Sequence, residues 1–302
     1  MKKNNLLYIA VILLFTNCVT QNTLTKNYTT VNQGITRDSL SIKNIQPIFT
    51  FPKELNENSG MEVDQDFIWT FNDSGGKNSI YKVDFKGNIV QEVEIQNAKN
   101  RDWEDITSDE NFIYVGDFGN NNGNRQDLTI YKINKSTITT KPQQSVVAET
   151  ITFEYNNRND FSKKPYQHDF DCESMFIYKN QIHLLTKAWK TGISSHYVLP
   201  TVAGNYKAQY LEKLNTQGFL TAADINGKQV SAVQYTREGE VVLWNFSFDK
   251  NSLLFNNPIQ ATYLGNTSEL GQIEGIMFFK NKLYISGEEM NGIPPTLYLI
   301  QR

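Results

Sequence analysis

The chain has 302 residues, with 29 Lys and Arg against 32 Asp and Glu, and only two cysteines. A chain of this length buries a sizeable core without covalent cross-links, and two cysteines exclude a disulfide framework. The formal net charge of −3 argues against a protein that binds duplex nucleic acid, which needs a basic face. With 39% hydrophobic and 20% charged residues, the composition also excludes a disordered chain and a membrane bundle.

The N-terminal segment is typical of an export signal. Lys2 and Lys3 precede an apolar run from Leu6 to Phe15, which has the length of a signal-peptide core and is too short to span a bilayer. The run continues into Phe-Thr-Asn-Cys, ending at Cys18, and resembles a bacterial lipoprotein signal in which the cysteine carries the lipid. We therefore predict a signal peptide over residues 1–17 and lipidation at Cys18. The protein would then be an outer-membrane lipoprotein or a periplasmic or cell-surface protein, and ordinary cleavage nearby is the main alternative.

Residues 18–44 are rich in Thr, Asn, Ser and Gln and have hardly any periodic apolar position. Such a composition buries too little apolar surface to fold alone, so this segment is expected to be a flexible tether. No second linker follows, and residues 45–302 are predicted to form one domain.

The rest of the chain repeats a unit of short strand-like runs five times. The first runs are spaced 45, 69, 50 and 51 residues apart, as measured at Gly60, Asp105, Ser174, Asp224 and Gly275. Periods of this length with four strands each are the signature of a β-propeller. The last unit lacks a fourth strand, and the apolar run Ile48–Pro52 is a spare strand that could close it. We predict an all-β, five-bladed propeller of four-stranded blades, with a six-bladed form as the alternative because of the 69-residue interval.

The first strands of a propeller line its central channel, so matching positions in the repeats face one axis. The residues at these positions are Ser59, Glu104, Glu173, Ala223 and Glu274. Three carboxylates on one axis repel each other unless a cation or protons compensate. A hydroxyl, backbone carbonyls and three carboxylates suit calcium, which takes six to eight oxygen ligands. The alternatives are protonated glutamates, or pairing with Arg101, Lys187 or Arg237.

The loops before the first strand and after the second strand of each unit are expected to share one face of the disc. That face collects the candidate catalytic carboxylates Asp73, Asp117 and Glu288. It also collects side chains that could bind a substrate: Asn120, Arg125, Lys187, Trp189 and Arg237. Asp and Asn before Gly are common turn residues, so a structural role competes with each catalytic assignment.

The succession Ser-Gly-Met at Ser59, Trp-Glu-Asp at Glu104, Glu-Ser-Met at Glu173 and Ile-Glu-Gly-Ile at Glu274 resembles the soluble calcium-activated nucleotidases (apyrases). Those enzymes are five-bladed propellers with a central calcium whose ligands come in the order serine, glutamate, glutamate, serine, glutamate. The resemblance implies these roles for Ser59, Glu104, Glu173, the segment 221–223 and Glu274. The fourth position departs from the family, because Ala223 offers only its carbonyl. The loop sequences, such as Asn-Asp-Ser-Gly at Asp73, also resemble those of a group of largely uncharacterised exported bacterial propellers.

The resemblance to the nucleotidases implies a calcium-dependent phosphate-ester hydrolase, in which a rim carboxylate accepts a proton and basic side chains hold phosphate. The alternative is a non-catalytic surface propeller that binds glycan or protein around a structural ion. In either case we expect a monomer that contacts the membrane only through a lipid. His183 is expected to be packed or on the surface, and Cys172 is a poor candidate nucleophile because Glu173 adjoins it.

Overall fold

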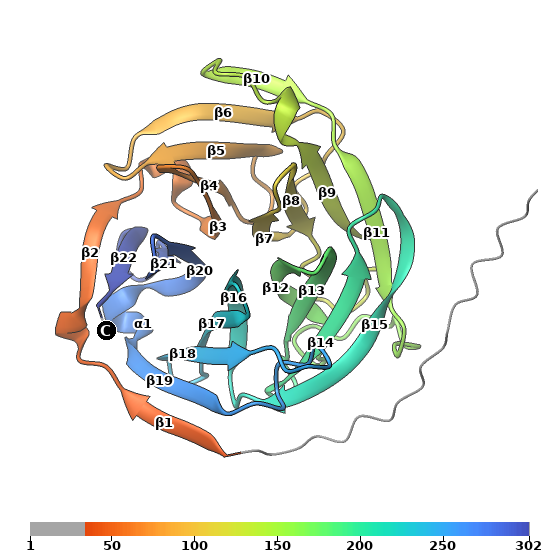
Figure 1. Cartoon of the computed structure of the whole chain (residues 1–302), viewed down its shortest axis with the longest axis vertical. Coiled ribbons are helices and arrows are strands. Elements are labelled where there is room, and N and C mark those ends of the chain that lie inside the picture. Colours follow the sequence, from red (N-terminus) through yellow and green to blue (C-terminus); the bar gives the residue numbers. More distant parts are fainter. Residues whose placement is uncertain (1–33, 302) are drawn as a thin grey trace, which may run out of the picture.

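Antiparallel sheets radiate from a central axis in the computed structural model, which describes residues 34–301 (Figure 1). The predicted signal peptide and Cys18 lie outside the described residues. The first unit contains β3 (Asn58–Asp64), β4 (Phe67–Asn72), β5 (Ser79–Asp84) and β6 (Ile89–Ile95). The second contains β7 (Trp103–Ser108), β8 (Phe112–Asp117), β9 (Leu128–Asn134) and β11 (Glu149–Tyr155). The third contains β12 (Asp171–Tyr178), β13 (Gln181–Lys187), β14 (Ile193–Pro200) and β15 (Gly204–Asn215).

Two further units complete the ring. The fourth contains β16 (Phe219–Asn226), β17 (Gln229–Tyr235), β18 (Glu240–Ser247) and β19 (Ile259–Asn266). The fifth contains β20 (Gln272–Phe279), β21 (Lys282–Glu288), β22 (Thr296–Ile300) and β2 (Ile45–Thr50). In each unit the strands pair as an antiparallel meander, and the innermost strands β3, β7, β12, β16 and β20 lie against one another around the axis (Figure 1). The prediction of an all-β propeller is confirmed.

The N-terminal strand β2 closes the ring, as the sequence predicted. It pairs with β22 in an antiparallel register from Ile45 opposite Ile300 to Thr50 opposite Thr296. The strand begins three residues before the predicted run. Because β2 precedes the first unit in the sequence and completes the last unit, it joins the two ends of the ring.

Short elements protect most of the outer edges. β10 (Gln143–Val146) pairs in parallel with β6, β11 pairs in parallel with β15, and β1 (Ile35–Ser39) pairs in parallel with β19. The long 69-residue interval is taken up partly by β10 and by the 3-10 turn η3 (Lys135–Thr137). The remaining helical elements are η1 (Ile42–Asn44), η2 (Lys53–Leu55) and α1 (Thr267–Leu270).

The expectation that residues 18–44 form a tether is wrong for its last ten residues. β1 and η1 fall inside this segment, and β1 is ordered by its backbone pairing with β19 rather than by burial, because four of its five side chains are exposed. Composition measures the apolar surface a segment can bury, so it gives no signal for a strand that is held by main-chain hydrogen bonds.

Asp105 ties the inner strands together at the axis. Its Oδ2 accepts a hydrogen bond from the backbone N–H of Met175 on β12 at 2.7 Å, and its Oδ1 accepts one from the N–H of Ile106 at 2.8 Å. The backbone N–H of Ala223 on β16 also donates to this carboxylate. Burial raises the pKa of Asp105, while these N–H groups oppose the rise. A Cβ at Gly60 on β3 would lie 3.0 Å from the Asp105 Cα, so the backbone of the first unit also packs here.

We expect Asp105→Ala to lower the free energy of unfolding by about 3 kcal/mol or more, because it leaves several buried N–H groups without an acceptor. Urea denaturation measures the change. The matched control is Asp66→Ala, whose carboxylate makes an exposed ion pair with Lys280 and should cost less than about 1 kcal/mol. Equal stabilities of the two variants would contradict the role given to Asp105.

Candidate functional site

A β-bulge interrupts four of the inner strands, β7, β12, β16 and β20, at the same level, whereas in β3 Ser59 is paired and the register shifts after it. The register shifts between Trp103 and Asp105, between Cys172 and Ser174, and between Ile273 and Gly275, which leaves one unpaired residue in each case. These unpaired residues are Glu104, Glu173 and Glu274. A bulge turns a side chain away from the regular alternation and is frequent beside functional sites. The three glutamates therefore hold equivalent places in the structure as well as in the sequence.

The fourth position of this set differs from the sequence-based assignment. The bulge of β16 falls between Leu220 and Ala222, so Thr221 occupies the place that the glutamates occupy elsewhere. Ala223 instead pairs with Ala232 and packs in an apolar cluster. Spacing alone placed Ala223 because the fourth repeat has no glutamate to mark the bulge.

The two hydroxyl-bearing residues of the set make similar contacts. Thr221 Oγ1 donates to the carbonyl oxygen of Ile273 at 2.6 Å, and Ser59 Oγ donates to the carbonyl oxygen of Glu104 at 3.0 Å. Each hydroxyl thus links its own unit to the next one. Their lone pairs remain available because donation uses only the hydrogen.

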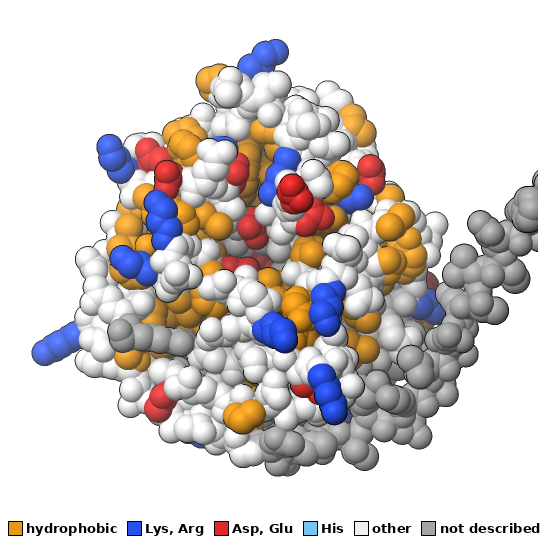
Figure 2. All heavy atoms as spheres, viewed as in Figure 1, with side chains coloured by type: hydrophobic (Ala, Val, Ile, Leu, Met, Phe, Trp, Pro, Cys, Tyr) orange, Lys and Arg blue, Asp and Glu red, His pale blue; other side chains and the backbone are white. Residues whose placement is uncertain are grey.

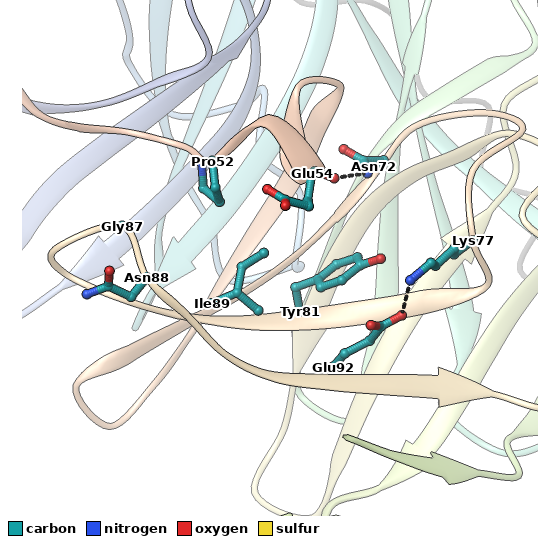
Figure 3. Close-up of a pocket in the computed structure, with 9 residues that line it drawn as sticks. All are labelled: Pro52, Glu54, Asn72, Lys77, Tyr81, Gly87, Asn88, Ile89 and Glu92. Atoms are coloured by element: carbon teal, nitrogen blue, oxygen red, sulfur yellow. Dashed lines mark hydrogen bonds and ion pairs between the residues drawn. The ribbon is translucent and has the colours of Figure 1, made fainter. Parts of the chain in front are cut away.

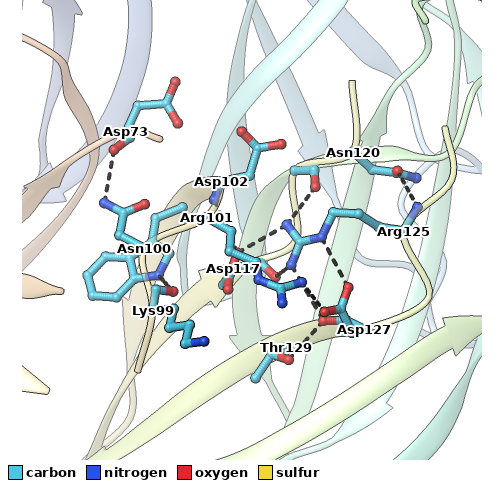
Figure 4. Close-up of polar contacts among 12 residues, drawn as sticks. Asp73, Lys99, Asn100, Arg101, Asp102, Asp117, Asn120, Arg125, Asp127 and Thr129 are labelled. Carbon is cyan, nitrogen blue, oxygen red and sulfur yellow. Dashed lines mark hydrogen bonds and ion pairs between the residues drawn. The ribbon is translucent and has the colours of Figure 1, made fainter. Parts of the chain in front are cut away.

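Three carboxylates meet at the mouth of the channel. Oxygens of Asp73, Asp102 and Glu104 all lie within 4.8 Å of one another. Asp73 follows β4 and Asp102 precedes β7. Figure 4 shows both side chains. The sequence pattern predicted a catalytic role for Asp73 and did not mark Asp102 as a metal ligand. Asp102 lies two residues before the bulged Glu104, in the loop that precedes β7, so only the loop conformation reveals it.

Gly119 forms the wall behind this cluster. A Cβ at Gly119 would overlap Glu104 Oε1 and would lie 2.5 Å from the Asp102 Cγ. The backbone N–H of Gly119 donates to the carbonyl oxygen of Asp102 at 3.1 Å. Glycine is thus the residue that lets the loop after β8 approach both carboxylates.

The carboxylates of the mouth raise one another's pKa values. Burial, followed by the charges of Asp102 and Glu274, raises the pKa of Asp73 to about 7. Burial and the charge of Asp171 raise the pKa of Asp102 to about 6. Burial and the charges of Glu274 and Asp73 raise the pKa of Glu288 to about 8.

Some oxygens of the cluster are left without internal donors. Asp73 Oδ1 and Glu274 Oε2 are buried and have no hydrogen-bond partner among residues 34–301. The other oxygen of Glu274 accepts from Gln272 Nε2 at 2.6 Å. Buried carboxylate oxygens without donors are costly, and a bound cation is one way in which proteins offset this cost.

Glu173 differs from the other glutamates because it has a cation of its own. Lys187 Nζ lies 2.9 Å from Glu173 Oε2, and both side chains are buried. The Lys187 ammonium also lies 4.7 Å from the ring centroid of Trp189 and 5.4 Å from that of Tyr235. Although burial lowers the pKa of Lys187, the charges of Glu173 and its neighbours hold it above its usual value. Lys187 is therefore a counterion within the channel, and its ammonium is paired with Glu173.

Asp117, Arg125 and Asn120 support the wall of the site (Figure 4). Arg125 Nη1 lies 3.0 Å from Asp117 Oδ1 and donates to the carbonyl oxygen of Gly119 at 2.8 Å. Asn120 Nδ2 donates to the carbonyl oxygen of Phe170, and Asn120 Oδ1 accepts from the Arg125 N–H at 2.9 Å. The structure thus gives these three predicted site residues internal partners around Gly119.

Trp189 and Arg237 lie on the rim between the third and fourth units. Trp189 Nε1 donates to Asp171 Oδ2 at 2.6 Å, and Arg237 Nη2 donates to the carbonyl oxygen of Trp189 at 2.5 Å. Acidic side chains gather near the middle of the face seen in Figure 2, with basic side chains around them.

Other titratable groups and grooves lie away from the mouth. His183 Nδ1 lies 2.8 Å from His196 Nε2, and both rings are buried in the third unit. Burial raises the pKa of the Cys172 thiol, which disfavours a nucleophilic role.

A groove of about 560 Å³ runs along β5 and β6, where the ion pair between Lys77 and Glu92 lies beside Tyr81 (Figure 3). Among residues 34–301, no helix is long and apolar enough to cross a membrane.

No protein-family model matches this chain, and no curated protein matches it. An exo-β-1,3-galactanase from Phanerochaete chrysosporium is similar in structure, with a TM-score of 0.51 and 9% identity over 80% of this chain and 58% of that one. A putative oxidoreductase (glucose dehydrogenase) from Thermus thermophilus has a TM-score of 0.45 and 8% identity over 84% of this chain and 99% of that one. A DUF4623 family protein from Bacteroides eggerthii has a TM-score of 0.41 and 9% identity over 82% of this chain and 55% of that one. At such identities the likeness shows the β-propeller fold alone.

The raised pKa values predict how the free energy of unfolding depends on pH when a chelator keeps the protein free of calcium. Between the ordinary carboxyl pKa of about 4 and the raised values of about 7 for Asp73 and about 8 for Glu288, the folded state binds more protons than the unfolded state. The contribution of these groups to stability is therefore lost as pH rises from about 4 to about 8. Asp73→Asn should be more stable than the original protein at pH about 8, and this difference should shrink at pH about 5.

Urea denaturation at the two pH values measures this difference. Asp66→Asn, in an exposed ion pair with Lys280, is the control and should show no such dependence. An Asp73→Asn protein that is less stable than the original at pH about 8 would contradict the repulsion inferred for the mouth.

Proposed function

We propose that this propeller binds a calcium ion at the mouth of its channel and presents that face to a ligand. The observation that carries the proposal is the cluster of Asp73, Asp102 and Glu104, whose oxygens lie within 4.8 Å of one another against the bare backbone of Gly119. Hard oxygen ligands in such number suit calcium better than a transition metal.

The residues present fit the ion as follows. Asp73, Asp102 and Glu104 would be the principal ligands, and Glu274 Oε2 has no competing donor among the described residues. The Ser59 and Thr221 hydroxyls could complete the set. Glu173, which the repeat pattern predicts as a ligand, is neutralised by Lys187 and would act mainly by holding that lysine in place.

When bound, calcium would supply positive charge that offsets the repulsion among the carboxylates and attracts oxygen atoms of a ligand. The chain itself supplies the rest of the site. Lys187 holds Glu173, and Gln272 orients Glu274. Arg125 and Asp117 fix the loop that carries Gly119.

Export and lipid attachment at Cys18 are part of the proposal. They are supported by the basic and apolar segment that ends at Phe15 and by the cysteine that follows it. The protein would then act as an outer-membrane lipoprotein, in the periplasm or at the cell surface. Calcium sites of extracellular proteins commonly have weak affinities, so even a weak site of this type could be occupied in an exported protein.

Calcium binding is tested by calorimetry and by thermal melting. Calcium should raise the melting temperature of the original protein, and more at pH about 8 than at pH about 5, because protons compete for the same oxygens. Glu104→Gln should lower calcium affinity at least about tenfold, an energy of about 1.4 kcal/mol. Gly119→Ala should also lower the affinity, although it removes no charge, because the methyl group displaces the Glu104 and Asp102 carboxylates.

Glu54→Gln is the matched control, because Glu54 lies in η2 outside the cluster and should leave calcium affinity unchanged. Glu173→Gln provides a contrast: it should destabilise the protein with or without calcium, since it leaves the buried Lys187 unpaired. The proposal fails if calcium and chelator leave the melting temperature unchanged, or if Glu104→Gln binds calcium as the original does.

Calcium-dependent hydrolysis of a phosphate ester is the second candidate. The observation in its favour is Glu288, a partly buried carboxyl whose pKa is raised to about 8 beside Asp73 and Glu274, so that it could exchange a proton near neutral pH. Against it, Lys187 and Arg125 already have internal acidic partners and are poor candidates for holding phosphate. A non-catalytic module that binds glycan or protein is therefore the better-supported form of the proposal.

Turnover of p-nitrophenyl phosphate distinguishes the two forms. If the protein is a hydrolase, Glu288→Gln should abolish turnover while calcium still binds, and Glu289→Gln, at the exposed neighbouring position, should retain it. If the original protein with calcium shows no turnover of this ester or of ATP, the hydrolase form is contradicted and the binding form stands.

A further inference from the structure

A pocket beside the channel mouth lies between the fourth and fifth units. It has a volume of about 340 Å³ and is lined chiefly by Phe219, Tyr235, Arg237, Thr267, Gln272 and Met290. These residues come from the start of β16, the turn after β17, α1, the start of β20 and the loop after β21. A cavity of this size holds a single ring with its substituents.

The pocket shares a wall with the acidic channel. Gln272 lines the pocket and donates its amide N–H to Glu274 Oε1 at 2.6 Å. The ring of Tyr235, on the same wall, lies 5.4 Å from the Lys187 ammonium. A molecule in the pocket would thus lie next to the carboxylates that we propose as calcium ligands.

Arg237 supplies the charge of the pocket. Its guanidinium lies 5.0 Å from the centroid of the Phe219 ring, and its Nη2 donates to the carbonyl oxygen of Trp189 at 2.5 Å. The rim arginines Arg101 and Arg125 pair with Asp127 and Asp117, whereas Arg237 has no carboxylate partner within residues 34–301. A guanidinium carries five N–H donors, so an oriented guanidinium with most donors free is prepared to bind an anion.

The walls favour a sugar ring over a nucleobase. The Phe219 ring is covered by Trp189, at 4.6 Å between centroids, and by Arg237, so it offers no open face for stacking. What remains is the partly exposed Tyr235, the thioether of Met290, and the hydroxyl and amide groups of Thr267 and Gln272. Such a mixture suits a ring with a narrow apolar face and several hydroxyl groups.

We propose that this pocket binds an acidic sugar residue, with its carboxylate on Arg237 and its hydroxyl groups toward Thr267 and Gln272. The inference rests on the proposed calcium site in one respect: six acidic side chains near the mouth, besides the neutralised Glu173, would repel a carboxylate unless a cation offsets their charge. These are Asp73, Asp102, Glu104, Asp171, Glu274 and Glu288.

Calorimetry with D-galacturonate as the probe tests the proposal. The protein with calcium should bind galacturonate more tightly than D-galactose, which lacks the carboxylate, and more weakly when chelator replaces calcium. Arg237→Gln should lower the affinity for galacturonate at least about tenfold, as expected for the loss of a charge-assisted hydrogen bond. It should leave calcium affinity within about twofold of the original, because Arg237 is not among the proposed ligands. Arg101→Gln, at a rim arginine paired with Asp127, is the matched control and should bind galacturonate as the original does.

The outcomes separate this inference from the proposed function. If calcium binds but galacturonate does not, or if Arg237→Gln binds galacturonate unchanged, the pocket assignment is overturned and the calcium site stands. If galacturonate binds equally well without calcium and calcium itself does not bind, the calcium site fails and the pocket stands. If uridine monophosphate binds more tightly than galacturonate and depends on Arg237, the pocket takes an anionic nucleotide and the sugar assignment is overturned.

Discussion

The buried carboxylate of Asp105 is the interaction on which the geometry of this propeller depends. It accepts backbone hydrogen bonds from Met175 on β12 and from Ile106 on its own strand, and Ala223 on β16 adds a third. Strands from three units are thereby held to one carboxylate near the axis. The bulged residue just before it, Glu104, is then directed into the mouth of the channel. The adjacent residues Glu104 and Asp105 therefore have two effects: Asp105 links the inner strands, and Glu104 contributes to the acidic site.

The mouth has more negative charge than the chain neutralises by itself. Lys187 balances Glu173, and Arg125 balances Asp117. Within residues 34–301, Asp73, Asp102, Glu104 and Glu274 have no basic side chain in ion-pair contact. Burial of such groups raises their pKa values and lowers stability at neutral pH. Natural proteins retain such a cost mainly at functional sites. The calcium ion proposed above would offset this charge.

Several side chains of this face hold neighbouring residues in place. Asn120, Arg125 and Asp117 hold the loop that carries Gly119, and Gly119 leaves room for two of the three clustered carboxylates. Trp189 binds Asp171 and anchors Arg237. The face therefore has an inner acidic part, which arginine and amide contacts hold in place, and an outer pocket. The arginine of that pocket, Arg237, has no carboxylate partner among the described residues.

The repeat, the propeller fold and the closing strand could be predicted from the sequence, because alternating apolar runs and their spacing are local properties of the chain. The run Ile48–Pro52, predicted as the closing strand, overlaps β2 (Ile45–Thr50). The folded structure was needed to see that Thr221 rather than Ala223 lies at the bulge, that Asp102 joins Asp73 and Glu104, and that Lys187 neutralises Glu173. The ordering of residues 35–39 as β1 also belongs to this group. Bulge register, loop conformation and parallel pairing across more than 200 residues depend on long-range contacts, and no local period in the sequence records them.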